Sequence, residues 1–144
     1  DLGRVYYYTG EFEKATNCFR EVIRRTPKQP DAYNLLGAVY KRRALYDEAI
    51  VTYKQAIRWG GETPDKHTHL AEIYFRQEKW DLAVKAYHHV LELDSSNFSA
   101  HYQLGSIYEV LGKNSHAIDE LLKAHQLDND DERTRQKLER LLIS

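Results

Sequence analysis

The sequence has little of what several specialised protein classes require. Its single cysteine, Cys18, cannot form a disulfide within the chain, which excludes a small scaffold held together by disulfides. Methionine is absent, and no apolar run approaches the roughly 18–20 residues that a transmembrane helix needs. Only three prolines interrupt the chain. With 42% hydrophobic and 30% charged residues, the composition predicts a folded domain that is too apolar for disorder and too polar for membrane insertion.

Concentrated charge of one sign is also lacking. The chain holds 21 Lys and Arg against 22 Asp and Glu, with a net charge of −1. Without a basic patch, nucleic acid is not an expected ligand. The lone cysteine fits a cytoplasmic protein, which we favour slightly, although the compartment is otherwise unknown. No secretory signal opens the chain, and residues 1–3 already follow the repeat pattern described next, so we interpret the sequence as part of a longer protein.

What the sequence does contain is a repeat with a period of 34 residues. Small residues recur at this step, and the same step relates a set of tyrosines, a set of alanines and a set of bulky residues. The sets are Gly3, Gly37, Ala71 and Gly105; Tyr6, Tyr40, Tyr74 and Tyr108; Ala15, Ala49, Ala83 and Ala117; and Phe19, Tyr53, Tyr87 and Leu121. A constant period of this length indicates an array of stacked structural units.

The order of these positions resembles the tetratricopeptide repeat (TPR), and the resemblance covers nearly the whole chain. It implies an all-α fold, namely a right-handed α-solenoid of antiparallel helix pairs, or TPR superhelix. We interpret residues 1–144 as a single TPR domain. Its parts are a truncated repeat over 1–29, full repeats over 30–63, 64–97 and 98–131, and a C-terminal capping helix over 132–144.

Apolar spacing and turn residues place the helices within these repeats. In the three full repeats the first helices are expected near 31–43, 65–77 and 99–111, and the second helices near 47–59, 81–93 and 115–127. The prolines Pro27, Pro30 and Pro64 then fall at turns between repeats, where they disturb helices least. The capping helix carries polar residues on one face, as the end of an array requires: Arg133, Lys137 and Arg140.

The resemblance also indicates where a ligand binds. In the TPR family, particular positions of the first helix of each repeat line a concave groove. Carried onto this sequence, the predicted peptide-binding groove comprises Arg4, Tyr7, Tyr8, Asn34, Lys41, Arg42, Thr68, Glu72, Phe75, Arg76, Tyr102 and Glu109. Aromatic and arginine residues are enriched in binding hot spots, and arginine holds carboxylates bidentately. We therefore expect a non-catalytic scaffold that binds a peptide or helix of a partner protein carrying acidic and apolar residues.

Two other functions fit the same pattern. The truncated first repeat leaves an open edge around Leu2, Tyr6 and Phe12, through which copies of the chain could form a homo-oligomer. The array could also be the substrate-recruiting arm of a larger multidomain protein. A third function is disfavoured, because the groove lacks the lysine and asparagine clamp with which TPR co-chaperones hold chaperone C-terminal tails.

Catalytic and metal sites are not expected, and no cofactor is predicted. No phosphate-binding glycine loop, nucleophile motif or zinc-protease motif occurs. His67 and His69 are two residues apart on a helix and point to different faces, while His67 and His101 share one bulky repeat position, which favours packing. The acidic residues of 128–132 suit a helix N-terminus better than a calcium loop, because Arg133 stands where such a loop requires glycine.

Overall fold

The computed structural model describes all 144 residues, and every regular element is an α-helix. The all-α prediction is therefore confirmed. The nine helices are α1 (Leu2–Thr9), α2 (Phe12–Arg25), α3 (Pro30–Arg42), α4 (Tyr46–Gly60), α5 (Pro64–Arg76), α6 (Trp80–Leu93), α7 (Phe98–Val110), α8 (Asn114–Leu127) and α9 (Glu132–Ile143). None of them has the length and apolar character that a bilayer span requires.

The helices of the full repeats begin one residue earlier than the sequence analysis expected, and local chemistry explains this. Pro30 and Pro64 are the first residues of α3 and α5. Proline suits this position because it has no N–H to leave unpaired and its φ angle is already helical. At α7, the side chain of Asn97 accepts a hydrogen bond from the N–H of Ala100 at 2.9 Å. The starts of α3, α5 and α7 are therefore favoured by a first-turn proline or by a capping side chain.

The turn inside each helix pair uses one left-handed residue at the same repeat position. Gly10 and Gly112 take this position with φ of 81° and 73°, whereas Ala44 and Glu78 take it with φ of 57°. The backbone N–H of the following residue reaches back to the carbonyl of the repeat tyrosine, as from Leu45 to the carbonyl oxygen of Tyr40 at 2.9 Å. This closes the helix end in a Schellman motif and reverses the chain.

Glycine suits a left-handed residue best, so Ala44→Gly is expected to stabilise the protein. Removing the strain stabilises the folded protein, whereas the greater flexibility of glycine stabilises the unfolded chain by a smaller amount. The net effect is an increase of about 0.5–1 kcal/mol in the free energy of unfolding. Urea denaturation measures this change. The reverse substitution at the equivalent position, Gly112→Ala, should lower the free energy of unfolding, and a loss of stability in Ala44→Gly would contradict the prediction.

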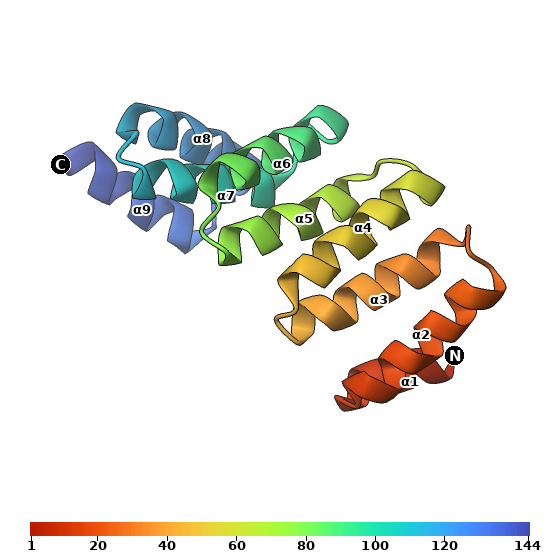
Figure 1. The fold of residues 1–144 in the computed structure, drawn as a ribbon. Coiled ribbons are helices and arrows are strands. Elements are labelled where there is room, and N and C mark those ends of the chain that lie inside the picture. Colours follow the sequence, from red (N-terminus) through yellow and green to blue (C-terminus); the bar gives the residue numbers. More distant parts are fainter.

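The helices pack in antiparallel pairs that form a row along the molecule (Figure 1). Contacts are most extensive within the pairs α1/α2, α3/α4, α5/α6 and α7/α8, and each pair then packs on the next through one further helix contact. Small residues allow close approach, since the repeat alanines Ala15, Ala49, Ala83 and Ala117 are fully buried. The core consists of three successive clusters rather than one centre, as expected for stacked repeats.

Candidate functional site

The first helices of the pairs carry the residues predicted to bind a ligand. We call α1, α3, α5, α7 and α9 the A helices, and α2, α4, α6 and α8 the B helices. The structure places Arg4, Tyr7 and Tyr8 on α1, Asn34, Lys41 and Arg42 on α3, Thr68, Glu72, Phe75 and Arg76 on α5, and Tyr102 and Glu109 on α7. It brings several of them together across neighbouring A helices and leaves others separate.

Ion pairs connect successive A helices at one repeated register. Lys41 of α3 donates to the carboxylate of Glu72 on α5, and its Nζ lies 3.3 Å from Nδ1 of His69. Burial alone would raise the pKa of Glu72, but the nearby imidazole of His69 and the hydrogen-bonded ammonium of Lys41 outweigh it and hold the pKa at about 2. Thirty-one residues separate Lys41 from Glu72. These charges are already compensated before any ligand arrives.

The same register recurs at the end of the array with the charges reversed. Glu109 of α7 accepts from Lys137 of α9 at 2.9 Å and also from Arg140. Burial would raise the pKa of Glu109, but these two hydrogen bonds lower it. The polar residues of the predicted capping helix thus do more than face water, because two of them attach α9 to α7.

These pairs change what the predicted cations can offer a ligand. Arg4 and Lys41 were predicted to be open to a partner, yet Arg4 lies 3.5 Å from the carboxylate of Asp1 and Lys41 is paired with Glu72. Arg42 and Arg76 differ, since neither has a carboxylate oxygen within 4.0 Å. The two uncompensated guanidinium groups are the last residues of α3 and α5.

Beside them lies a pocket with a volume of about 490 Å³, which we call the aromatic pocket. Phe75 meets Trp80 edge to face, with ring centroids 5.3 Å apart. The lining residues are Lys41, Glu72, Phe75, Arg76, Glu78, Trp80, Tyr87 and Gln103. Four of them belong to the predicted groove set, and the other four do not. Trp80 begins α6 at the position that Phe12 and Tyr46 hold in earlier pairs, so its bulk was the available signal.

The remaining predicted residues have local roles in the structure. The hydroxyl of Thr68 donates to the carbonyl oxygen of Pro64 in its own helix at 2.8 Å. The side-chain oxygen Oδ1 of Asn34 is buried and has no hydrogen-bond partner. Tyr102 stacks against Phe98, and its ring lies 5.1 Å from the guanidinium of Arg133. Tyr102 therefore contributes to the contact between α7 and α9, apart from the aromatic pocket.

Tyr7, Tyr8 and Arg42 form a separate group. Tyr7 meets Tyr8 edge to face at 5.2 Å, and the guanidinium of Arg42 lies 5.5 Å from the centroid of the Tyr7 ring. The same guanidinium lies 5.5 Å from the ring of Phe12. Two aromatic faces therefore orient a cation that has no acidic partner.

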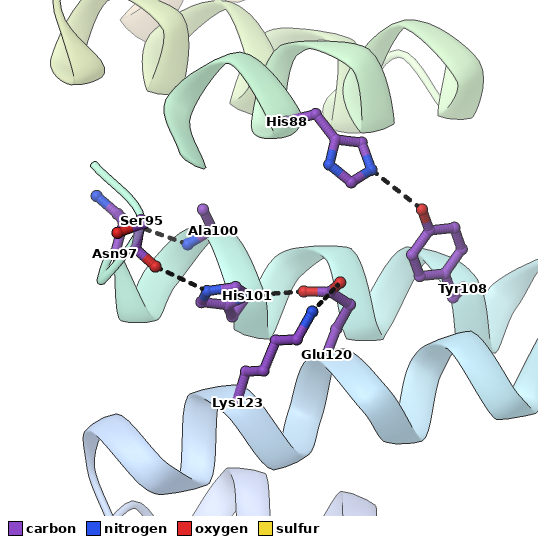
Figure 2. A network of polar contacts seen from close by, with 8 residues as sticks. All are labelled: His88, Ser95, Asn97, Ala100, His101, Tyr108, Glu120 and Lys123. Atoms are coloured by element: carbon purple, nitrogen blue, oxygen red, sulfur yellow. Dashed lines mark hydrogen bonds and ion pairs between the residues drawn. The ribbon is translucent and has the colours of Figure 1, made fainter. Parts of the chain in front are cut away.

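A second pocket, lined by none of the predicted groove residues, lies between α6, α7 and α8. This histidine pocket has a volume of about 450 Å³ and is lined by His88, Leu91, Ser95, His101, Glu120, Lys123, Gln126 and Leu127. Figure 2 shows the buried His101 placed between two acceptors, with Nδ1 2.6 Å from Glu120 and Nε2 3.1 Å from the carbonyl oxygen of Ser95. Sequence reasoning assigned His101 to packing and missed this pair.

The bond from His101 to the turn before α7 has an equivalent in the second repeat. There the hydroxyl of Tyr33 donates to the carbonyl oxygen of Pro27 at 2.8 Å. In the third repeat the corresponding carbonyl, that of Gly61, accepts from Lys66 at 2.8 Å instead. The buried Nε2 of His67 then has no hydrogen-bond partner and lies 4.0 Å from the carboxylate of Glu62, while the ring stacks on His89. Nowhere in the chain do three or more His, Cys, Asp or Glu residues form a group able to hold a metal ion.

Comparison with protein families decides what these helix pairs are. A family model described as TPR repeat matches residues 3–43 and 71–112, which together make up more than half of the chain. This chain belongs to the tetratricopeptide repeat family. A second model, described as tetratricopeptide repeat, matches residues 30–59 and 98–131 of the same TPR chain. TPR repeats are generally protein–protein interaction modules and are typically non-catalytic.

Solved TPR structures resemble the whole chain. A crystal structure of MamA is 21% identical with a TM-score of 0.91, covering 99% of this chain and 84% of that one. MamA from Desulfovibrio magneticus RS-1 is 17% identical with a TM-score of 0.88, covering 99% and 80%. YrrB, described as a TPR protein with an unusual peptide-binding site, is 20% identical with a TM-score of 0.83, covering 98% and 73%. At these identities the likeness shows the fold. No curated protein matches the sequence.

Proposed function

We propose that this TPR array is a non-catalytic scaffold that binds a peptide or helix of a partner protein across the A helices. The aromatic pocket is the observation that carries the proposal. It lies between α3, α5, α7 and the start of α6, and it combines the half-buried rings of Phe75 and Trp80 with the amide of Gln103. Aromatic side chains provide contact area, and the amide can accept from and donate to a peptide backbone.

The charges around the pocket support a ligand with acidic residues. Lys41 and Glu72 neutralise each other at its edge, so the pair fixes the spacing of α3 and α5 without adding net charge. Arg76 lies at the same edge and has no carboxylate partner. In a ligand with an acidic side chain beside an apolar one, the carboxylate would pair with the guanidinium of Arg76, and the apolar side chain would pack on the rings of Phe75 and Trp80. The peptide-binding site described for YrrB belongs to that protein and is consistent with such a use of the fold.

Reversing the two uncompensated charges tests the proposal. In a crosslinking pull-down from native lysate, Arg42→Glu with Arg76→Glu is expected to recover a partner at least tenfold less than the unchanged protein does. The physical reason is that two attractive guanidinium groups become repulsive carboxylates towards an acidic ligand. Circular dichroism and urea denaturation establish that the variant remains folded.

The matched control is Lys54→Glu with Lys85→Glu. Both lysines are exposed on B helices and belong to no ion pair, so the control makes the same change in net charge away from the A helices. It should recover the partner as the unchanged protein does. Equal recovery by the groove variant, the control and the unchanged protein would overturn the proposed function and direct attention to the outer surface.

A further inference from the structure

We propose that Arg42 and Arg76 form a phosphate subsite, so that the peptide bound by this array carries a phosphorylated serine or threonine. The inference rests on the peptide-binding function proposed above and specifies one part of its ligand. Both arginines line a small pocket of about 230 Å³, which we call the arginine pocket. Its other lining residues are Lys41, Ala44 and Tyr46.

Charge accounting favours a doubly charged ligand. No carboxylate lines the arginine pocket, and the ammonium of Lys41 is already matched by Glu72. Glu78 lines the neighbouring aromatic pocket but lies beyond ion-pair distance of either arginine. Two guanidinium charges therefore remain. A phosphorylated side chain carries about −1.5 to −2 at neutral pH, whereas a single carboxylate carries −1 and would compensate only one of them.

The geometry of the arginines suits bidentate recognition. The rings of Tyr7 and Phe12 lie on the guanidinium of Arg42 and limit its orientations, which reduces the entropy lost on binding. Arg42 and Arg76 end α3 and α5, where outward-facing backbone carbonyls disfavour an anion. The first residue of α4, Tyr46, also lines the pocket. The two arginine side chains supply its uncompensated charge, and a planar guanidinium holds a phosphate better than an ammonium does.

The neighbouring aromatic pocket explains why the phosphate belongs to a peptide. Lys41 and Arg76 line both pockets, so the two are contiguous. A phosphorylated residue over the arginines would place an adjacent apolar side chain against Phe75 and Trp80. Free phosphate would leave that apolar surface unused. Recognition of phosphorylated motifs by paired arginines is an established mode of peptide binding.

Three peptide libraries test the inference. Each has degenerate flanking positions around one fixed residue, which is phosphoserine, serine or glutamate, and each is passed over the immobilised protein. The phosphoserine library should be retained at least tenfold better than either of the others. Arg42→Lys with Arg76→Lys preserves the charge but removes the bidentate donors, so it should lose most of this preference while retaining the serine library unchanged. Arg24→Lys with Arg58→Lys, on B helices, is the matched control and should keep the preference.

Each of the other possible results of the library experiment would contradict one specific claim. Equal retention of phosphoserine and glutamate libraries would replace the phosphate subsite with a carboxylate subsite. Equal retention of all three would remove the anion subsite and leave the proposed peptide binding intact. Absence of retention of any library would overturn the proposed function itself. If inorganic phosphate shifts the arginine Nε resonances while no phosphopeptide is preferred, the pocket binds free phosphate and the inference is wrong.

Discussion

Replacing His101 with leucine is expected to lower the free energy of unfolding by about 3 kcal/mol, because it leaves a buried carboxylate without its hydrogen-bond partner. The Ser95 carbonyl can only accept, so Nε2 of His101 must donate to it, while Nδ1 lies 2.6 Å from Oε2 of Glu120. The Glu120 side chain is only 12% exposed. After the substitution, its nearest cation is Lys123, whose Nζ lies 3.5 Å away (Figure 2).

The companion variant Glu120→Ala should cost less, about 1 kcal/mol, because the imidazole of His101 still donates to Ser95 and only one of its two hydrogen bonds is lost. Alanine is also the residue at the equivalent position of the third repeat, Ala86. The double variant, His101→Leu with Glu120→Ala, removes both polar partners and should recover much of the stability lost in His101→Leu. Urea denaturation of the four proteins gives the coupling energy, and strictly additive losses would show that the pair is not coupled.

This pair shows where the sequence sufficed and where it did not. The 34-residue period predicted the helices and their pairing, because each repeated small or bulky residue has the same packing role in every unit. The contact between His101 and Glu120 depends instead on a deviation from the repeat. Glu120 stands at a position where the other repeats have Cys18, Thr52 and Ala86. A carboxylate at an otherwise small position was a signal, but its partner is 19 residues away on another helix.

The groove residues show a similar division. The register predicted which side chains stand on the A helices, and Phe75 and Arg76 do line one pocket. It could not predict which charges are already compensated, since ion pairs depend on side-chain reach between helices. Lys41 and Glu72 illustrate this, because each stood in the predicted groove and they bind each other. The groove itself remains a proposal that the binding experiments test.

Gly105→Val is expected to destabilise the protein by about 3 kcal/mol, because valine overpacks the contact between α7 and α8. Even the Cβ atom alone would lie 2.6 Å from Cγ of Leu121 and 3.3 Å from the backbone oxygen of Ala117. Leu121 is fully buried and cannot move into solvent, and the Ala117 oxygen belongs to the helix backbone. The better helix propensity of a residue other than glycine, worth less than about 1 kcal/mol, does not offset this clash. Thermal or urea unfolding measures the loss.

The space at the repeat position of Gly105 depends on the side chain that faces it. The equivalent residue Gly37 therefore provides a control. Gly37 faces Tyr53, and an added Cβ would lie 3.0 Å from the ring atoms, so Gly37→Ala should cost less than Gly105→Ala. Shortening the facing side chain in Gly105→Val with Leu121→Ala should restore part of the stability, because the valine then fills the space that leucine leaves. If the double variant lost as much stability, relative to the unchanged protein, as the two single variants lose in sum, overpacking would not be the cause. Since α7 also carries Glu109, which holds α9 through Lys137, the same overpacking should loosen α9 and increase amide exchange there.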